Sequence, residues 1–250
     1  MGLTGACPGT ILVQIATGAS SGLYVLGGAV LGGIVWTRFQ HLARLKAPAA
    51  SVVSKDDGPN TEKGYTVYEA ARMTETQGVL IYGLLCSAMI AFTSYLTPHP
   101  FGSPRLNPII GGLAIGSAQA ASLILTGSAI GVSGAYESIG KYCNRILGFS
   151  PSNKDPWPST GPIIFVLGIL GGSWSLGNIL DLKIVPEAVP ISRIRAIIGG
   201  VALVVGARTA GGCTSGHGIS GMATLSKSSF VTVAAMFAGG IAISGLLGYF

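Results

Sequence analysis

Charged residues are scarce in this chain. Asp, Glu, Lys and Arg make up 10% of its 250 residues, whereas a typical soluble domain has about 25%. Too few charges are present to cover a water-soluble core. Five stretches contain no charge, namely 1–37, 78–104, 106–136, 161–180 and 228–250. Each is long enough to cross a bilayer, which takes about 20 mostly apolar residues. The sequence therefore predicts an all-α, polytopic integral membrane protein, which we expect in the plasma membrane.

The motifs of several other protein classes are also missing. The four cysteines are too few and too scattered for a disulfide scaffold. The three histidines lie far apart and no Cys-x-x-Cys occurs, so we predict no metal site. No phosphate-binding loop or hydrolase motif is present, so we predict neither a cofactor nor an enzyme. The net charge of +6 is interpreted as orientation and lipid contact, and not as nucleic-acid binding.

Glycine, by contrast, is abundant, with 39 residues. In membranes it allows close helix packing and broken or re-entrant backbone. We expect spans at 22–36, 79–95, 163–180 and 228–249, and a span with a re-entrant piece at 109–136. The segment 137–158 is interpreted as a loop, 196–207 as an apolar stretch too short for a simple span, and 209–226 as a small-residue segment. Residues 1–250 then form a single transport domain, in which 38–77 is a polar extramembranous linker.

Two short repeats suggest duplicated halves. The sequence IIGGLA at 109–114 returns as IIGGVA at 197–202, and GACPG around Cys7 resembles GGCTS around Cys213. In both cysteine motifs a serine follows 13 positions later, Ser20 and Ser226. Transporters commonly contain such repeats and bind substrate near the bilayer midplane between them. The repeats therefore predict a central pore lined by broken helices.

The segment 206–221, with sequence GARTAGGCTSGHGISG, is too rich in glycines and hydroxyls for a helix that faces lipid. Its exposed backbone N–H groups would favour an anion. The thiol of Cys213 is polarisable and a weak hydrogen-bond donor, which suits a sulfur-containing anion, although an isolated free cysteine is more often a buried small side chain. The candidate substrate-binding and pore residues are Cys7, Thr10, Arg208, Gly212, Cys213, Thr214, Ser215, Gly216 and His217.

The supporting residues have structural alternatives. Arg208 could attract the anion or extend its side chain to the interface. His217 is more often a packed, hydrogen-bonded side chain than a ligand. The hydroxyls of Thr10, Thr214 and Ser215 could bind anion oxygens or satisfy broken backbone.

The GACPGT motif at Cys7, the GGCTSGHGISG motif at Cys213 and the stretch from Gly111 to Glu137 resemble the YeeE/YedE sulfur-transport family, which includes thiosulfate importers. The resemblance implies an all-helical, repeat-built fold in which thiosulfate passes between cysteine thiols, with Cys7 and Cys213 as the relay cysteines. Fuller members carry a further cysteine-bearing element before the first motif. This chain begins almost at that motif, so it is either an incomplete chain or a shortened relative that needs a partner, and a partner subunit or a sulfur-accepting protein is the expected partner.

Three alternatives remain open at the level of sequence. The first is a membrane sulfurtransferase that carries a persulfide on Cys213. The second is an accessory membrane subunit that does not transport by itself. The third is a channel for another small solute.

Overall fold

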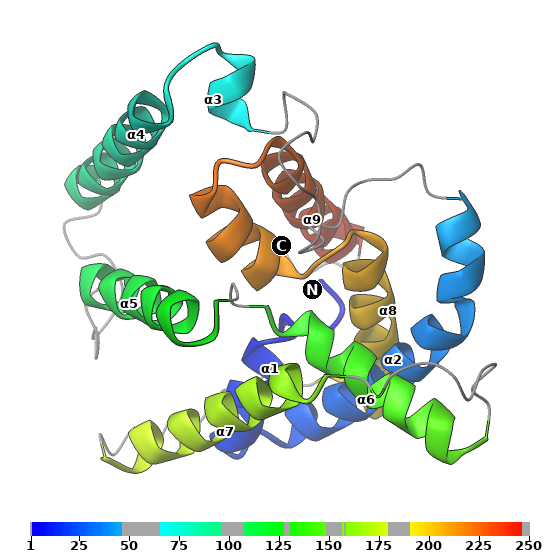
Figure 1. The fold of residues 1–250 in the computed structure, drawn as a ribbon. Helices are drawn as coiled ribbons and strands as arrows, with labels where there is room; N and C mark the ends of the chain where they lie inside the picture. The colour runs from blue at the N-terminus through cyan, green and yellow to red at the C-terminus, as the bar shows by residue number, and fades with distance from the viewer. Residues whose placement is uncertain are drawn as a thin grey trace.

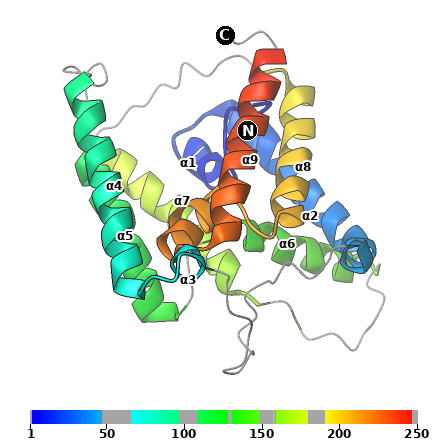
Figure 2. The ribbon, with the colours of Figure 1, turned by 90° about the horizontal axis from the view of Figure 1, so that it is seen from above.

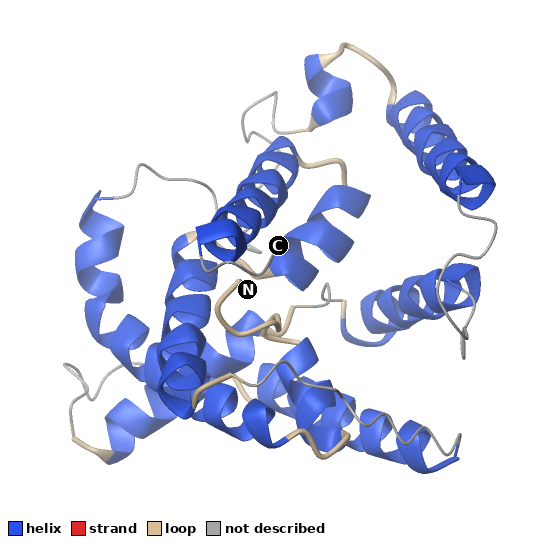
Figure 3. Cartoon of the chain, turned by 180° about the vertical axis from the view of Figure 1, so that it is seen from behind, coloured by secondary structure: helices blue, strands red, loops and turns tan. Residues whose placement is uncertain are grey.

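The computed structural model describes residues 2–46, 66–96, 108–127, 131–148, 157, 159–179 and 191–246. These residues form helices, drawn in Figure 3, and a single isolated bridge between Thr66 and Ser226. The elements in chain order are α1 (Thr10–Ala16), α2 (Ser20–Lys46), α3 (Val67–Ala70), α4 (Glu75–Leu96), α5 (Pro108–Thr126), α6 (Ser133–Ile146), α7 (Gly161–Ile179), α8 (Arg193–Thr209), the π-helix η1 (Ser215–Gly221) and α9 (Lys227–Leu246).

Four of these helices are long and apolar enough to cross a membrane. The candidate spans are Ser21–Gln40 in α2, Glu75–Phe92 in α4, Gly161–Ile179 in α7 and Lys227–Leu246 in α9. A shorter apolar helix, Ile109–Leu125, lies within α5. Each charge-free stretch of the sequence thus overlaps an apolar helix, which confirms the prediction of an all-α, polytopic membrane protein.

Helix α2 lies at the centre of the packed part of the molecule, against α8 and α6 (Figure 1). Its closest contacts with these helices are made at glycine residues. A Cβ atom on Gly28 would lie 2.2 Å from the carbonyl oxygen of Ile197 in α8, and a Cβ on Gly33 would lie 2.3 Å from that of Tyr136 in α6. The backbones therefore touch directly, as small residues allow between membrane helices. This packing fixes α6 and α8 relative to each other through α2.

Two apolar clusters fill the space around α2. One contains Leu12, Ala29, Val132, Tyr136 and Val204, and the other contains Ala6, Ile11, Val25 and Ala196. Both include residues of the N-terminal segment up to the end of α1. The segment that carries Cys7 is therefore part of the core.

Helices α4 and α5 lie to one side of this core (Figures 1 and 2). None of the span residues of α4 is buried. Helix α4 contacts α9 through edge-to-face packing of Tyr82 on Phe230. Helix α5 contacts η1 through a hydrogen bond, 3.3 Å long, that Ser220 donates to Gln119. Such large apolar surfaces would be a liability in water, but lipid solvates them.

The interpretation of 137–158 as a loop is wrong in its first part, because residues 133–146 form helix α6. Small and polar residues of this helix make its contacts with α2. Gly140 lies against the backbone of α2, with an ideal Cβ position 2.4 Å from the carbonyl oxygen of Gly33, and Asn144 donates a hydrogen bond, 3.2 Å long, to the carbonyl of Ile34. The helix thus uses small and polar residues to pack against α2 and is not an apolar span.

Residues 47–65 of the expected linker lie outside the described residues. Of the rest, 38–46 continue α2, and α4 begins at Glu75. The short apolar stretch at 196–207 lies inside α8, which has 17 residues.

Candidate functional site

The two cysteine motifs have the same local conformation. Gly5 and Gly211 each stand two residues before a cysteine, and their φ angles are +60° and +82°. Left-handed backbone of this kind is strongly unfavourable for residues with a Cβ. These glycines turn the chain so that Cys7 and Cys213 lie just before the short helices α1 and η1.

The sulfur of each cysteine accepts a backbone amide at the start of its short helix. The Sγ atom of Cys7 accepts the N–H of Thr10 at 3.4 Å, and the Sγ of Cys213 accepts the N–H of Gly216, three residues on in both cases. The carbonyl of each cysteine accepts the amide four residues later, at 3.1 Å and 2.9 Å respectively. The short repeat in the sequence therefore corresponds to a repeat in structure.

The repeat continues into the turn after each short helix, but with a shift of one residue. The amide of Ala19 donates to the carbonyl of Gln14, and the amide of Ser226 donates to the carbonyl of Gly221, both spanning five residues. Ala19 follows Cys7 by 12 positions, whereas Ser226 follows Cys213 by 13. The predicted correspondence of Ser20 with Ser226 is therefore wrong by one residue, because the second copy holds an extra residue in its π-helix. Such π-helical turns are frequent at functional sites.

The N-terminal turn of α6 joins the two motifs. The buried phenol of Tyr136 donates a hydrogen bond, 2.9 Å long, to the carbonyl of Pro8, next to Cys7. Both the backbone and the side chain of Ser133 make hydrogen bonds to the Cys213 thiol. Tyr136 also lies within electrostatic range of both thiols. One helix end thus holds together two cysteines that are about 200 residues apart in the sequence.

The two cysteines differ in exposure. Cys213 is 1% exposed, and its Sγ lies 3.0 Å from the hydroxyl of Ser215. The hydroxyl oxygen of the neighbouring Thr214 is buried and has no hydrogen-bond partner. Cys7 is partly exposed. A polarisable sulfur therefore lies among several hydrogen-bond donors at Cys213, and a more accessible one lies at Cys7.

Among the other predicted residues, Thr10 supports the Cys7 loop. Its hydroxyl accepts the amide of Cys7 at 2.7 Å and donates to the carbonyl of Cys7 at 3.1 Å. Both bonds lie within the loop, and the side chain of Thr10 is exposed. The geometry thus favours the alternative in which this hydroxyl satisfies broken backbone.

His217 is held on both ring nitrogens. Its Nδ1 lies 3.1 Å from the hydroxyl of Ser229 in α9, and its Nε2 lies 3.1 Å from the carbonyl of Ala210. Because a carbonyl only accepts, Nε2 carries the proton, and Nδ1 accepts from Ser229 in the neutral ring. A Cβ on Gly212 would lie 3.0 Å from Nε2, so the glycine makes room for the ring. His217 therefore connects the loop of Cys213 to α9 through hydrogen bonds.

Arg208 forms an ion pair with Glu137 of α6, and Glu137 also lies 2.7 Å from the Nζ atom of Lys141. The Nε atom of Arg208 is buried without a hydrogen-bond partner. Arg208 also lies within electrostatic range of Cys213. The cation predicted to draw an anion thus interacts electrostatically with the thiol, and a carboxylate already neutralises it.

The sequence did not lead us to expect Tyr136 or Glu137 of α6 at the site. One signal was available, because Glu137 and Lys141 have the spacing of a helical ion pair. The interpretation of 137–158 as a loop concealed it. The contact with Arg208 depends on helix packing and leaves no mark in the local sequence.

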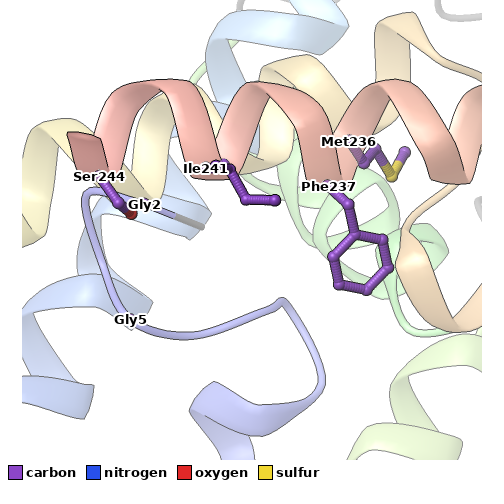
Figure 4. Close-up of a pocket in the computed structure, with 7 residues that line it drawn as sticks. Gly2, Gly5, Met236, Phe237, Ile241 and Ser244 are labelled. Carbon is purple, nitrogen blue, oxygen red and sulfur yellow. The ribbon is translucent and has the colours of Figure 1, made fainter. Parts of the chain in front are cut away.

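Figure 4 shows an open pocket elsewhere, between α9 and the loop that precedes Cys7. It is lined by Gly2, Gly5, Met236, Phe237, Gly240, Ile241 and Ser244. Its side chains are apolar apart from one serine, so it offers an anion no charge and few donors. The pocket shares Gly5 with the first cysteine motif, but neither Cys7 nor Cys213 lines it.

The fold and the site together define a helical integral membrane protein with a repeated cysteine motif at its centre. The family model for sulphur transport matches residues 1–242, and the chain belongs to this family. Two relatives from Xylella fastidiosa, strains 9a5c and Temecula1, each named "Probable transporter", are 31% identical over 144 residues. The match covers 57% of this chain and 95% of each relative. Family and relatives support membrane transport of a sulfur compound.

Proposed function

We propose that this protein carries a small sulfur-containing anion, thiosulfate, across the membrane, and that the thiols of Cys213 and Cys7 hold the anion in turn. The observation that carries the proposal is the shared contact of both cysteine motifs with the N-terminal turn of α6. A relay requires two soft binding groups near one another. Membership of the sulphur transport family supports a sulfur substrate.

The surroundings of Cys213 suit such an anion. Ser133, Ser215 and the backbone of Gly216 provide hydrogen-bonding groups at the sulfur, and Arg208 provides a nearby positive charge. Donors and a cation replace water around oxyanions, while the thiol contacts the terminal sulfur. Permeation also needs binding that is weak enough for release, which thiol contacts provide.

The test is uptake of radiolabelled thiosulfate by cells or proteoliposomes that contain the full chain. We expect Cys213→Ala and Cys7→Ala each to lower uptake by about tenfold or more, since a contact to an anion contributes on the order of 1.5–3 kcal/mol. Cys86→Ala, in α4, is the matched control and should transport normally. Unchanged uptake by Cys213→Ala would remove the relay.

The same preparations separate the alternatives. A lasting persulfide on Cys213 after exposure to thiosulfate, seen by mass spectrometry without net uptake, would indicate a sulfurtransferase. Uptake that appears only with a co-purified protein would indicate an accessory subunit. Equal competition by sulfate, sulfite and thiosulfate would indicate a less selective channel.

A further inference from the structure

The carboxylate of Glu137 lies between an inner and an outer cation. Its Oε2 atom contacts Arg208, and its Oε1 atom lies 2.7 Å from the Nζ atom of Lys141. The side chain of Glu137 is 12% exposed, that of Arg208 is 23% exposed and that of Lys141 is 43% exposed. The inner cation is the one within electrostatic range of Cys213.

The inner cation is not fully satisfied by the carboxylate. The guanidinium of Arg208 contacts Glu137 through Nη2, while its Nε–H is buried without an acceptor. A buried donor without an acceptor is destabilising. A guanidinium offers two adjacent N–H groups to one oxyanion, so an anion bound at Arg208 would supply the missing acceptor.

Resting on the proposed function, we propose that Glu137 is a built-in competitor of the transported anion for Arg208. Without substrate, Glu137 neutralises Arg208. The arriving anion displaces the carboxylate from Arg208, and Glu137 keeps its contact with Lys141. The site therefore never holds an uncompensated buried cation, and the substrate is not forced against a carboxylate that has no other partner.

This arrangement predicts opposite effects for two substitutions. In Glu137→Gln the competitor is gone, so the KM for thiosulfate falls, and the maximal rate falls too because release from Arg208 is slower. In Lys141→Met the carboxylate loses its second partner and stays on Arg208, so the KM rises. Each shift should be about two- to fivefold, as expected for partly exposed ion pairs.

The experiment measures the initial rate of radiolabelled thiosulfate uptake against concentration in proteoliposomes, normalised to the amount of monodisperse protein. Glu75→Gln and Lys227→Met are the matched controls, because they make the same charge changes at exposed helix starts in α4 and α9. Both should leave KM unchanged. As a second readout, chloride should inhibit Glu137→Gln more strongly than wild type, because Arg208 is then open to a small anion. A purely structural role for Glu137 would not change chloride inhibition.

Opposite KM shifts with raised chloride inhibition in Glu137→Gln would support the proposal. Shifts in the same direction, or none, would overturn it. If Glu137→Gln does not yield folded protein, Glu137→Asp retains the charge but shortens the reach, and its KM should fall by a smaller factor; an unchanged or higher KM there would also overturn the proposal. Failure of the proposed function would appear as a different result, namely equal thiosulfate uptake by wild type and Cys213→Ala.

Discussion

The hydrogen bond from Tyr136 to Pro8 gives a direct test of how α6 holds the Cys7 loop. The phenol is 2% exposed and donates to the buried carbonyl at 2.9 Å. Tyr136→Phe keeps the ring in its apolar cluster but removes the donor and leaves the carbonyl without a partner. Such a change costs about 1–3 kcal/mol. Because the lost contact joins α6 to the Cys7 loop, we expect the cost to appear mainly as easier opening of that loop.

The assay is amide hydrogen exchange in detergent, read by mass spectrometry. The amides of Ile11 and Leu12 are protected by the carbonyls of Cys7 and Gly9. Where opening is a rapid pre-equilibrium, exchange follows the free energy of local opening, and 1.4 kcal/mol corresponds to tenfold. We therefore expect these amides to exchange about tenfold faster in Tyr136→Phe.

Two comparisons make this result specific. The amide of His217, bonded to the carbonyl of Cys213, should exchange at its wild-type rate, because the Cys213 thiol is held through Ser133. Tyr95→Phe removes the same hydroxyl from a residue that is 85% exposed and should change nothing. Unaltered exchange at Ile11, or equal acceleration in both loops, would refute the view that Tyr136 anchors the first motif.

Three further substitutions test the packing around the site. Gly140→Ala places a Cβ 2.4 Å from an α2 carbonyl oxygen and should lower the free energy of unfolding by about 1–3 kcal/mol, whereas Gly27→Ala, with no atom within 4 Å, should be neutral or slightly stabilising in thermal unfolding. Ser229→Ala leaves Nδ1 of His217 without its partner and should lower the free energy of unfolding by about 1–3 kcal/mol, seen as a lower midpoint of detergent unfolding. An unchanged midpoint would contradict the view that His217 connects the Cys213 loop to α9. Gly211→Ala should cost about 1–2 kcal/mol from left-handed strain alone, since no atom lies within 4 Å, and wild-type stability would contradict the φ of +82°.

The apolar helices were predictable from the sequence because lipid is their solvent. A stretch without charge that is long enough to span a bilayer has few alternatives to a helix. The expected spans at 163–180 and 228–249 thus correspond to α7 (Gly161–Ile179) and α9 (Lys227–Leu246). No tertiary contact was needed to find them.

Helix α6 was not predicted from the sequence because its composition is not that of an apolar helix in contact with lipid. Its residues are chosen for contact with other helices. Gly140 permits close approach to α2, Asn144 bonds to the backbone of α2, and Glu137 meets Arg208 of α8. Each of these properties belongs to a pair of segments. The candidate site was therefore predictable as two cysteines and an arginine, but not as the helix end that holds them together.

The two copies of the cysteine motif have become unequal in a way that fits the proposed relay. Cys7 is partly exposed, whereas Cys213 is buried, so an anion at Cys213 would give up more of its water. Removing a charged group from water is costly unless a counter-charge and hydrogen bonds replace the lost solvent. Arg208 and the donors around Cys213 stand at the motif where that cost is larger, while the first motif has glycine, proline and threonine at the equivalent positions and no cation in its loop. The charge is thus placed where dehydration is greatest, and its pairing with Glu137 keeps that position stable when no anion is bound.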